Sequence, residues 1–156
     1  MTAQVPERLL YEGEELSLCS EPLQSYFRKS EIKSPFFGEC TSNWRGYVGT
    51  WEIRDGRLYL VDLDGHLYLE GLDGAVKDGG AANLETIFPG YPDRVFAHWY
   101  SGELRVPRGR MLKYVHMAYD SRYEEDFFIR VENGVVTGNA DVQERRARRP
   151  RKWSMN

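Results

Sequence analysis

The sequence contains little of what metal or redox chemistry needs. It has two cysteines in 156 residues, with no Cys-x-x-Cys pair, and its three histidines lie far along the chain from both thiols. The ligand spacing of a zinc site is therefore missing. A nucleophile elbow, a phosphate-binding loop and a dinucleotide-binding glycine motif are missing as well. These absences predict a protein with no metal and no cofactor, and they leave it without a catalytic signature.

Long apolar runs are also absent. No stretch approaches the ~18 apolar residues that a membrane-spanning helix needs. The first ten residues include Pro6, Glu7 and Arg8 and lack the apolar centre of a secretory leader. We therefore expect a cytoplasmic protein in which Cys19 and Cys40 are reduced thiols. A disulfide between them is the alternative for an exported chain.

Charge is distributed unevenly along the chain. Six of the 21 basic residues lie between Arg145 and Lys152, which leaves 15 basic against 24 acidic residues elsewhere. This pattern predicts a single β-rich domain over residues 1–143 and a basic C-terminal tail over residues 144–156. The tail is either a solvated end or a docking arm, anchored by Trp153, for an acidic partner or for the acidic body itself. An acidic body repels phosphate, so it is not expected to bind nucleic acid.

The run from Trp44 to Leu60 gives the strongest fold signal. At its centre, Asp55-Gly56 tolerates the positive φ values of a type I′ turn, which predicts a two-residue hairpin. The turn sets Trp51 opposite Leu60, and the apolar side chains on the two sides of the turn then share one face. The other predicted pairs are Ile53–Leu58, Glu52–Tyr59 and Arg54–Arg57.

Further turn signals predict more hairpins along the chain. They are Asp64-Gly65, Ser101-Gly102 and Asn133-Gly134. They predict that strands pair as hairpins on either side of each turn, with Val131 opposite Val136 at the last one. An alternating segment over 111–119 is a further predicted strand, covered on both sides. Short helices are predicted over 20–29, where Ser20 can cap, and over 84–88.

These elements together predict the fold class. The protein is expected to be mainly β, with an antiparallel, hairpin-built sheet that is barrel-like or folded into a sandwich. One or two short helices complete it. Closing or folding the sheet hides its edges, and the regular hairpins favour a barrel.

Aromatic and charged residues gather in the second half of the chain and supply candidate binding residues. Aromatics reach 13% of the sequence, and Tyr and Trp favour binding surfaces as well as strands. The acidic stretch 120–126 is either a face that meets a basic partner or a solvated loop. The residues predicted to bind are Tyr100, Arg105, His116, Tyr119, Tyr123 and Glu124.

His116 is the histidine for which a catalytic role is considered. A catalytic histidine needs a carboxylate to orient it, and Glu124 follows His116 in the chain. This pair would serve an uncharacterised enzyme. The alternative is that His116 is a half-buried polar group in a sheet.

Gly49-Thr50-Trp51 resembles the Gly-x-Trp element on the first barrel strand of lipocalins and fatty-acid-binding proteins. Those families carry small apolar ligands inside a barrel, so the resemblance implies such a ligand, with Trp51 packing at the barrel base. From the residues alone, Gly46 and Gly49 leave room for neighbouring indoles. Trp44 and Trp51 are therefore predicted to belong to the core.

A second resemblance covers more of the chain. The segments WRGYVGTWEI, WYSG and YVHM, which begin at Trp44, Trp99 and Tyr114, look like those of a group of small bacterial proteins of unassigned function. In size, acidity and aromatic content the chain is also similar to immunity proteins, which neutralise toxins.

Three functions follow as hypotheses. The first is a non-enzymatic interaction module, immunity-like in character, that presents aromatic and acidic residues to a protein partner. The second is a small β-barrel that binds an apolar small molecule. The third is an enzyme that uses His116 with a nearby carboxylate.

Overall fold

β-Strands make up most of the computed structural model, which describes residues 3–36, 42–70, 76–115, 119, 121–143 and 153–155. The strands are β1 (Glu7–Tyr11), β2 (Glu14–Leu18), β3 (Tyr47–Arg54), β4 (Arg57–Glu70), β5 (Val76–Ala82), β6 (Val95–Phe96), β7 (Gly102–Lys113), β8 (Arg122–Glu132), β9 (Val135–Gln143) and β10 (Ser154–Met155). The helices are α1 (Pro22–Lys29) and α2 (Leu84–Ile87).

Two predicted hairpin turns form as expected. Asp55 and Gly56 have φ values of 52° and 73°, and Asn133 and Gly134 have values of 49° and 82°. Positive φ at both central positions is the signature of the type I′ turn. The pairs that result include Trp51–Leu60, Ile53–Leu58 and Val131–Val136.

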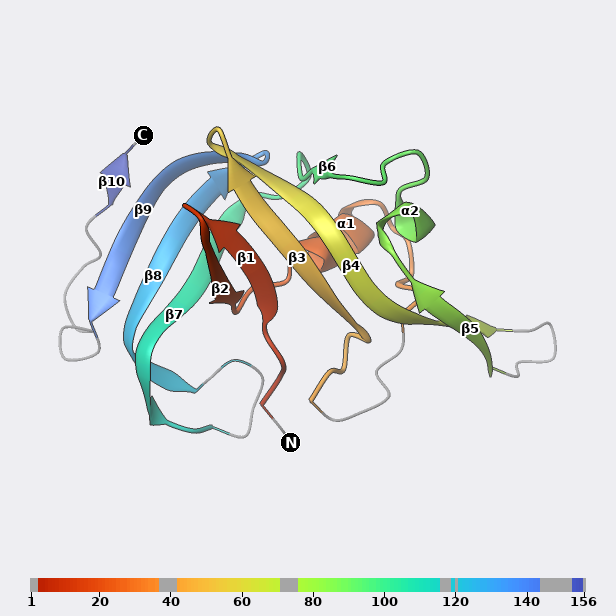
Figure 1. The fold of residues 1–156 in the computed structure, drawn as a ribbon, viewed down its shortest axis with the longest axis horizontal. Helices are drawn as coiled ribbons and strands as arrows, with labels where there is room; N and C mark the ends of the chain where they lie inside the picture. Colours follow the sequence, from red (N-terminus) through yellow and green to blue (C-terminus); the bar gives the residue numbers. More distant parts are fainter. Residues whose placement is uncertain are drawn as a thin grey trace.

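The strands form one mixed sheet in the order β2-β1-β3-β4-β9-β8-β7 (Figure 1). The prediction of a mainly β fold is therefore confirmed. The sheet is not purely antiparallel, however, because β1 runs parallel to β3. β2 runs antiparallel to β1 and so already reverses the direction of the chain, and β3, which follows β2 and α1, lies beside β1 in the same direction.

The sheet bends into two arms, which are β2-β1-β3-β4 and β9-β8-β7. The arms meet where β4 lies beside β9, and they approach each other again where β2 comes near β7. β4 pairs with β9 only where Arg57 meets Val135. At the other margin, Cys19 N donates a hydrogen bond of 2.8 Å to Arg105 O. No ladder joins β2 to β7 in the described residues, so the predicted barrel is not closed.

The predicted turn at Asp64-Gly65 is wrong. β4 runs straight through both residues, and Gly65 pairs with Tyr47 on β3. A Cβ on Gly65 would lie 2.6 Å from Phe36 Cε1 and 2.9 Å from Tyr47 Cβ. Gly65 is thus a packing glycine, which lets two aromatic side chains lie against the strand.

The predicted turn at Ser101-Gly102 is also wrong. Val95–Phe96 pairs with β4, and β7, which starts at Gly102, pairs with β8. The Tyr100 hydroxyl donates to Glu103 O at 3.0 Å, and its ring occupies the space where a Cβ on Gly102 would lie. Gly102 therefore admits this ring, and the strands on its two sides have different partners.

The other predicted elements form in part. α1 and α2 confirm both short helices. Ser20 does not cap α1, because its hydroxyl bonds to β7 instead. The predicted strand over 111–119 ends early, because β7 stops at Lys113. Residues 116–118 of that strand lie outside the described residues.

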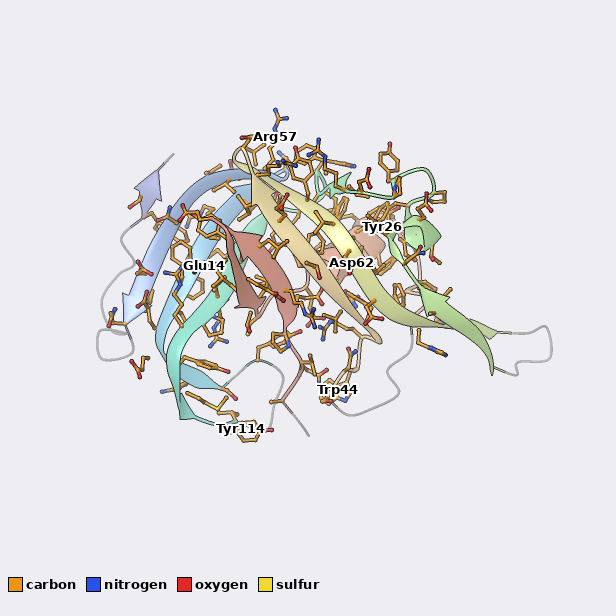
Figure 2. The ribbon with its side chains drawn as sticks, in the orientation of Figure 1. Glu14, Tyr26, Trp44, Arg57, Asp62 and Tyr114 are labelled. Atoms are coloured by element: carbon orange, nitrogen blue, oxygen red, sulfur yellow. The ribbon has the colours of Figure 1, made fainter. Side chains whose placement is uncertain are left out.

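The core fills the space between the sheet arms and α1. Trp51 is fully buried, and its ring lies edge-on to that of Trp99, with 6.4 Å between centroids. α1 contributes Leu23 and Phe27. The predicted burial of Trp51 is confirmed, whereas that of Trp44 is wrong, because Trp44 precedes β3 and is 47% exposed. Figure 2 places Trp44 at the lower end of the molecule.

Candidate functional site

A buried ion pair joins the first strand to the segment before β3. Glu7 Oε2 accepts hydrogen bonds from Arg45 Nη2 at 2.9 Å and from Gly49 N at 2.6 Å, and Glu7 Oε1 accepts one from Trp51 Nε1 at 3.4 Å. The side chains of Arg45 and Glu7 are 3% and 0% exposed. Burial raises the pKa of the Glu7 carboxyl, while Arg45 and the Gly49 N–H oppose this rise.

The absence of a side chain at Gly49 has a structural role. A Cβ at this position would lie 2.8 Å from Glu7 Oε1 and 3.0 Å from Trp51 Nε1. Only a glycine therefore lets the Glu7 carboxylate reach the backbone of β3. The Gly-x-Trp element therefore binds the buried Glu7 carboxylate, and Trp51 packs in the core.

Part of this polar cluster has no hydrogen-bond partner among the described residues. The orphaned atoms are Arg45 Nε and Nη1, the Tyr47 hydroxyl and the Tyr119 hydroxyl. Burial raises the pKa of both tyrosines, and the charge of nearby Glu21 raises both further. Polar groups left in this way are costly unless water or a ligand satisfies them.

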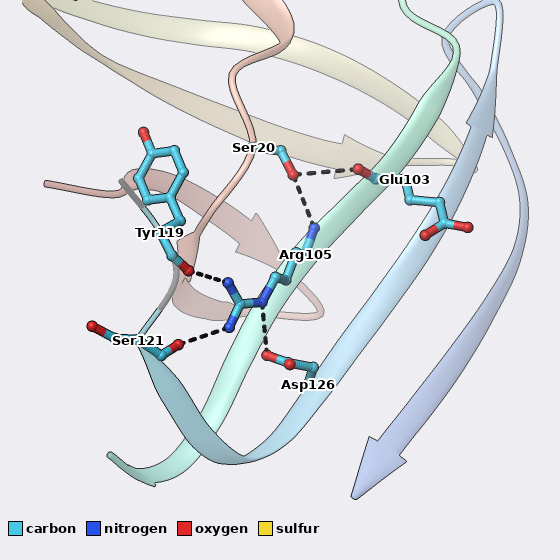
Figure 3. Close-up of polar contacts among 6 residues, drawn as sticks. All are labelled: Ser20, Glu103, Arg105, Tyr119, Ser121 and Asp126. Atoms are coloured by element: carbon cyan, nitrogen blue, oxygen red, sulfur yellow. Dashed lines mark hydrogen bonds and ion pairs between the residues drawn. The ribbon is translucent and has the colours of Figure 1, made fainter. Parts of the chain in front are cut away.

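Arg105 on β7 holds the segment around Tyr119 against the sheet (Figure 3). Its Nε donates to Asp126 Oδ1 at 3.0 Å, its Nη2 to Ser121 O at 3.0 Å, and its Nη1 to Tyr119 O. Ser20 Oγ accepts from Arg105 N at 3.0 Å, so it joins the loop before α1 to the same strand. The forked guanidinium thus ties β8 and the segment with Tyr119 and Ser121 to β7, and the backbone N–H of the same residue adds the loop before α1.

A pocket of about 340 Å³ opens beside this network, between β2, β7 and the N-terminal residues. Cys19 lines it, and burial raises the pKa of that thiol to about 11. A thiol with so high a pKa is a poor nucleophile at neutral pH. The walls are otherwise mainly apolar or aromatic. The lining residues are Ala3, Gln4, Pro6, Ser17, Cys19, Pro107, Gly109, Met111, Tyr114, Tyr119, Ser121 and Tyr123.

Exposed apolar side chains surround this pocket. Met111 and Tyr114 line it and are each 46% exposed. Trp44 is tied to the same region, because its backbone N donates to Gln4 Oε1 at 2.8 Å. A second hollow of about 310 Å³ shares Pro6 and Ser17 with the pocket and includes exposed Val5. We call the pocket with Val5, Trp44, Met111 and Tyr114 the apolar end; Figure 2 shows Trp44 and Tyr114 at the bottom of the molecule.

A wider hollow of about 570 Å³ beside the end of α1 is less suited to specific binding. It is more open, and charged residues such as Arg28, Glu31 and Lys33 line much of it. Ile32 is its one large exposed apolar side chain among the described residues. The apolar end is therefore the stronger candidate.

The structure brings together part of the predicted binding set. Tyr119 and Tyr123 line the pocket, and Arg105 donates to Tyr119 O beside it. Glu124 is exposed on β8, against Gly109 of the pocket wall. Tyr100 is buried and bonds to Glu103 O, so it belongs to the core. His116 lies outside the described residues, as does Cys40.

Sequence reasoning missed the partner of Arg45. Glu7 was noted only as a charged residue near the N-terminus, and no partner was predicted for Arg45. A usable signal existed in Gly49, since a glycine inside a strand marks close approach by another group. Met111 and Tyr114 were placed in a covered strand and are instead exposed at the pocket rim.

Comparison with protein-family models, with curated proteins and with solved structures finds no match to this chain. The described residues contain no group of three or more His, Cys, Asp or Glu side chains arranged to hold a metal ion. None of the described helices has the length and apolar character to span a membrane.

Proposed function

We propose that this chain is a non-enzymatic binding module and that its apolar end binds a protein partner. One observation carries the proposal. A pocket of about 340 Å³ opens among exposed apolar side chains that include Met111 and Tyr114. Exposed apolar surface gathered around a concavity is typical of interaction sites, whereas scattered exposed residues are not.

The chemistry of the pocket indicates what the partner presents. Met and Tyr are enriched at interfaces, and a pocket with such walls accepts one buried apolar or aromatic anchor. The anchor would meet the aromatic faces of Tyr119 and Tyr123. Outside residues 145–152 the chain has 15 basic and 24 acidic residues. A partner with basic residues around its anchor would therefore associate faster.

The described residues give less support to an enzyme. The Cys19 thiol has a pKa of about 11, so it is protonated at neutral pH. Arg105 and Asp126 bond to each other, and Arg105 also bonds to backbone, which is a structural use of both charges.

An apolar small molecule is the second candidate occupant, because it would use the same pocket. The interior between the sheet arms is filled by side chains such as Trp51 and Trp99.

Affinity capture from the native host, followed by binding measurements with the purified partner, tests the proposal. Met111→Asp and Tyr114→Asp place a charge on exposed parts of the apolar end, so neither should unfold the chain. We expect both variants to bind the purified partner at least about tenfold more weakly than the wild type. Tyr91→Asp is the matched control, because Tyr91 is 56% exposed and lies outside the pocket lining.

Equal binding by all variants would contradict the proposal, as would the absence of any partner retained specifically by the wild type. Native mass spectrometry of the purified chain tests the second candidate, which is an apolar small molecule in the same pocket. A bound small molecule that Met111→Asp releases would assign the pocket to that ligand. The immunity-like role stays a prediction, which requires that the captured partner be a toxin whose activity is lost on binding.

A further inference from the structure

The outer edge of β9 is the sheet edge to which this chain's own C-terminal residues bind. β8 pairs with β9 from Gln143 back to Val135. On the other side of β9, β4 reaches only Val135. In the described part of the chain, the remaining edge is paired only by β10. An edge of this kind presents unpaired backbone N–H and C=O groups, which can bind another strand.

β10 shows what this edge accepts. Ser154 pairs with Asn139 and Met155 with Gly138, in antiparallel register. The ring of Trp153 lies over Arg130 of β8, with 4.0 Å from the guanidinium carbon to the ring centroid. β10 therefore lies beside β9 at the margin of the sheet (Figure 1). Backbone pairing and one aromatic contact together hold the segment.

Arg130 also lies near a carboxylate of the neighbouring strand. Its Nη2 lies 3.7 Å from Glu103 Oε1 on β7, the next strand of the sheet. A positioned guanidinium attracts the face of an aromatic ring, and it does so whichever chain supplies the ring. The ring site is thus part of the folded sheet and does not depend on β10.

The hold of β10 on the edge is small. Two residue pairs cover only Gly138 and Asn139 of the nine-residue strand β9. Trp153 is only half-buried. A longer strand would pair with the rest of the edge as well and would keep the contact with Arg130. Such a strand would form more backbone hydrogen bonds with this edge than β10 forms.

The register also indicates the charge of the binding strand. Ser154 lies opposite Asn139, so a longer strand that continued this antiparallel ladder would place its aromatic residue opposite Ala140 and the residue before it opposite Asp141. Asp141 is exposed. A basic residue at that position would form a favourable cross-strand pair. In this chain, Lys152 precedes Trp153 in the sequence.

We propose that the outer edge of β9 is a binding site for an extended segment of a partner protein that carries a basic residue followed by an aromatic one. The segment adds a strand to the sheet, which is a known mode of peptide recognition. Its aromatic ring replaces Trp153 on Arg130, and its backbone displaces β10. Residues 153–155 are the resident occupant of the site, and they compete with the partner.

The test uses a labelled peptide with the sequence of residues 151–156, Arg-Lys-Trp-Ser-Met-Asn, and the full chain. Trp153→Ala removes a half-buried ring and should leave the fold intact. We expect this variant to bind the peptide at least about tenfold more tightly than the wild type, because its internal competitor is weakened. The amide NMR signals of residues 136–142 should shift on binding. A peptide with Ala in place of Trp should bind at least about tenfold more weakly.

Two further variants complete the test. Arg130→Gln, made in the Trp153→Ala chain, should weaken peptide binding, whereas Met111→Asp at the apolar end should not. Failure of the proposed function at the apolar end would therefore leave this result unaffected. Binding that ignores the Trp→Ala change in the peptide, or amide shifts away from β9, would overturn the inference. A concentration-dependent dimer with the same amide shifts would assign the edge to a second copy of this chain and would also overturn it.

Discussion

Glu7 and Arg45 form an ion pair that is closed to solvent, although they lie 38 residues apart in the sequence. The pair ties β1 to the segment that leads into β3, and Gly49 and Trp51 donate to the same carboxylate. The parallel pairing of β1 with β3 therefore has a polar anchor at its start. A buried charge is tolerated only when it is paired and hydrogen-bonded, so each member of the pair depends on the other.

Removing one member of this pair should destabilise the protein strongly. We expect Arg45→Met to lower the free energy of unfolding by about 3–5 kcal/mol, because it leaves the Glu7 carboxylate buried without its partner. The double variant Glu7→Leu with Arg45→Met should lose less than the sum of the two single losses, because it leaves neither charge behind. Urea denaturation of the four proteins measures this coupling.

An exposed ion pair between β1 and β2 provides the control. Arg8 and Glu15 lie 3.7 Å apart, with side chains 63% and 59% exposed. Arg8→Gln should cost less than about 1 kcal/mol, since solvent screens exposed pairs. A cost for Arg45→Met as small as that for Arg8→Gln would contradict the structural role given to the buried pair.

Glu7 should also make stability depend on pH. Its pKa in the folded chain is raised above the usual value of 4.5 by burial. The folded chain therefore holds this proton more tightly than the unfolded chain does. The contribution to stability is complete below about pH 4.5 and is lost as the pH rises through the raised pKa. Glu7→Gln removes a titrating group, so the difference in unfolding free energy between wild type and Glu7→Gln should change with pH in this direction.

Denaturation curves recorded at several values between about pH 4 and pH 8 would measure this difference. Glu15→Gln is the matched control, because Glu15 is exposed on β2. A difference between Glu7→Gln and the wild type that stays constant over this range would show that the Glu7 carboxyl does not titrate as its burial requires.

The sequence predicted local geometry well and failed where distant residues meet. The turns at Asp55 and Asn133 depend on two residues each, so their φ values and the pairing beside them follow from local rules. Asp64-Gly65 and Ser101-Gly102 also look like turns in the sequence, but neither forms a hairpin turn. Phe36 packs against Gly65, and Tyr100 packs against Gly102. Tertiary packing decides between these outcomes.

The candidate site shows the same limit. Arg105, Tyr119 and Tyr123 were predicted because aromatic and charged residues cluster in that part of the sequence. Cys19 and Met111 join them only because β2 approaches β7, and this approach depends on how the sheet bends. Single-residue composition does not encode it. The sequence therefore predicted Tyr119 and Tyr123 at the site and missed Cys19 and Met111.

Arg105 should be essential for the order of the pocket wall. Its guanidinium donates to Asp126, Ser121 and Tyr119, three acceptors that a lysine ammonium cannot reach together. We expect Arg105→Lys to lower the free energy of unfolding by about 1–3 kcal/mol. Amide hydrogen exchange near Ser121 should become faster by more than the global loss explains, because the segment is released from β7.

An exposed arginine offers a comparison for this substitution. Arg8→Lys should leave both stability and the exchange of Ser121 unchanged, since Arg8 lies on β1 and is solvent-exposed. If Arg105→Lys slows exchange or leaves it at the wild-type rate, the guanidinium does not hold the pocket wall as described.

Cys19 should react slowly with alkylating reagents even though it lines a pocket. Burial raises its thiol pKa from 9.0 to about 11. At about pH 8 the thiolate fraction is then about 100-fold smaller than for a thiol with the unshifted value, and only the thiolate reacts. In a Cys40→Ser chain, iodoacetamide should therefore label Cys19 about 100-fold more slowly in the folded state than in urea. The rate should keep rising with pH up to about 11. Labelling in the folded state that matches the rate in urea, or that levels off below about pH 9, would mean that the pocket leaves Cys19 fully solvated.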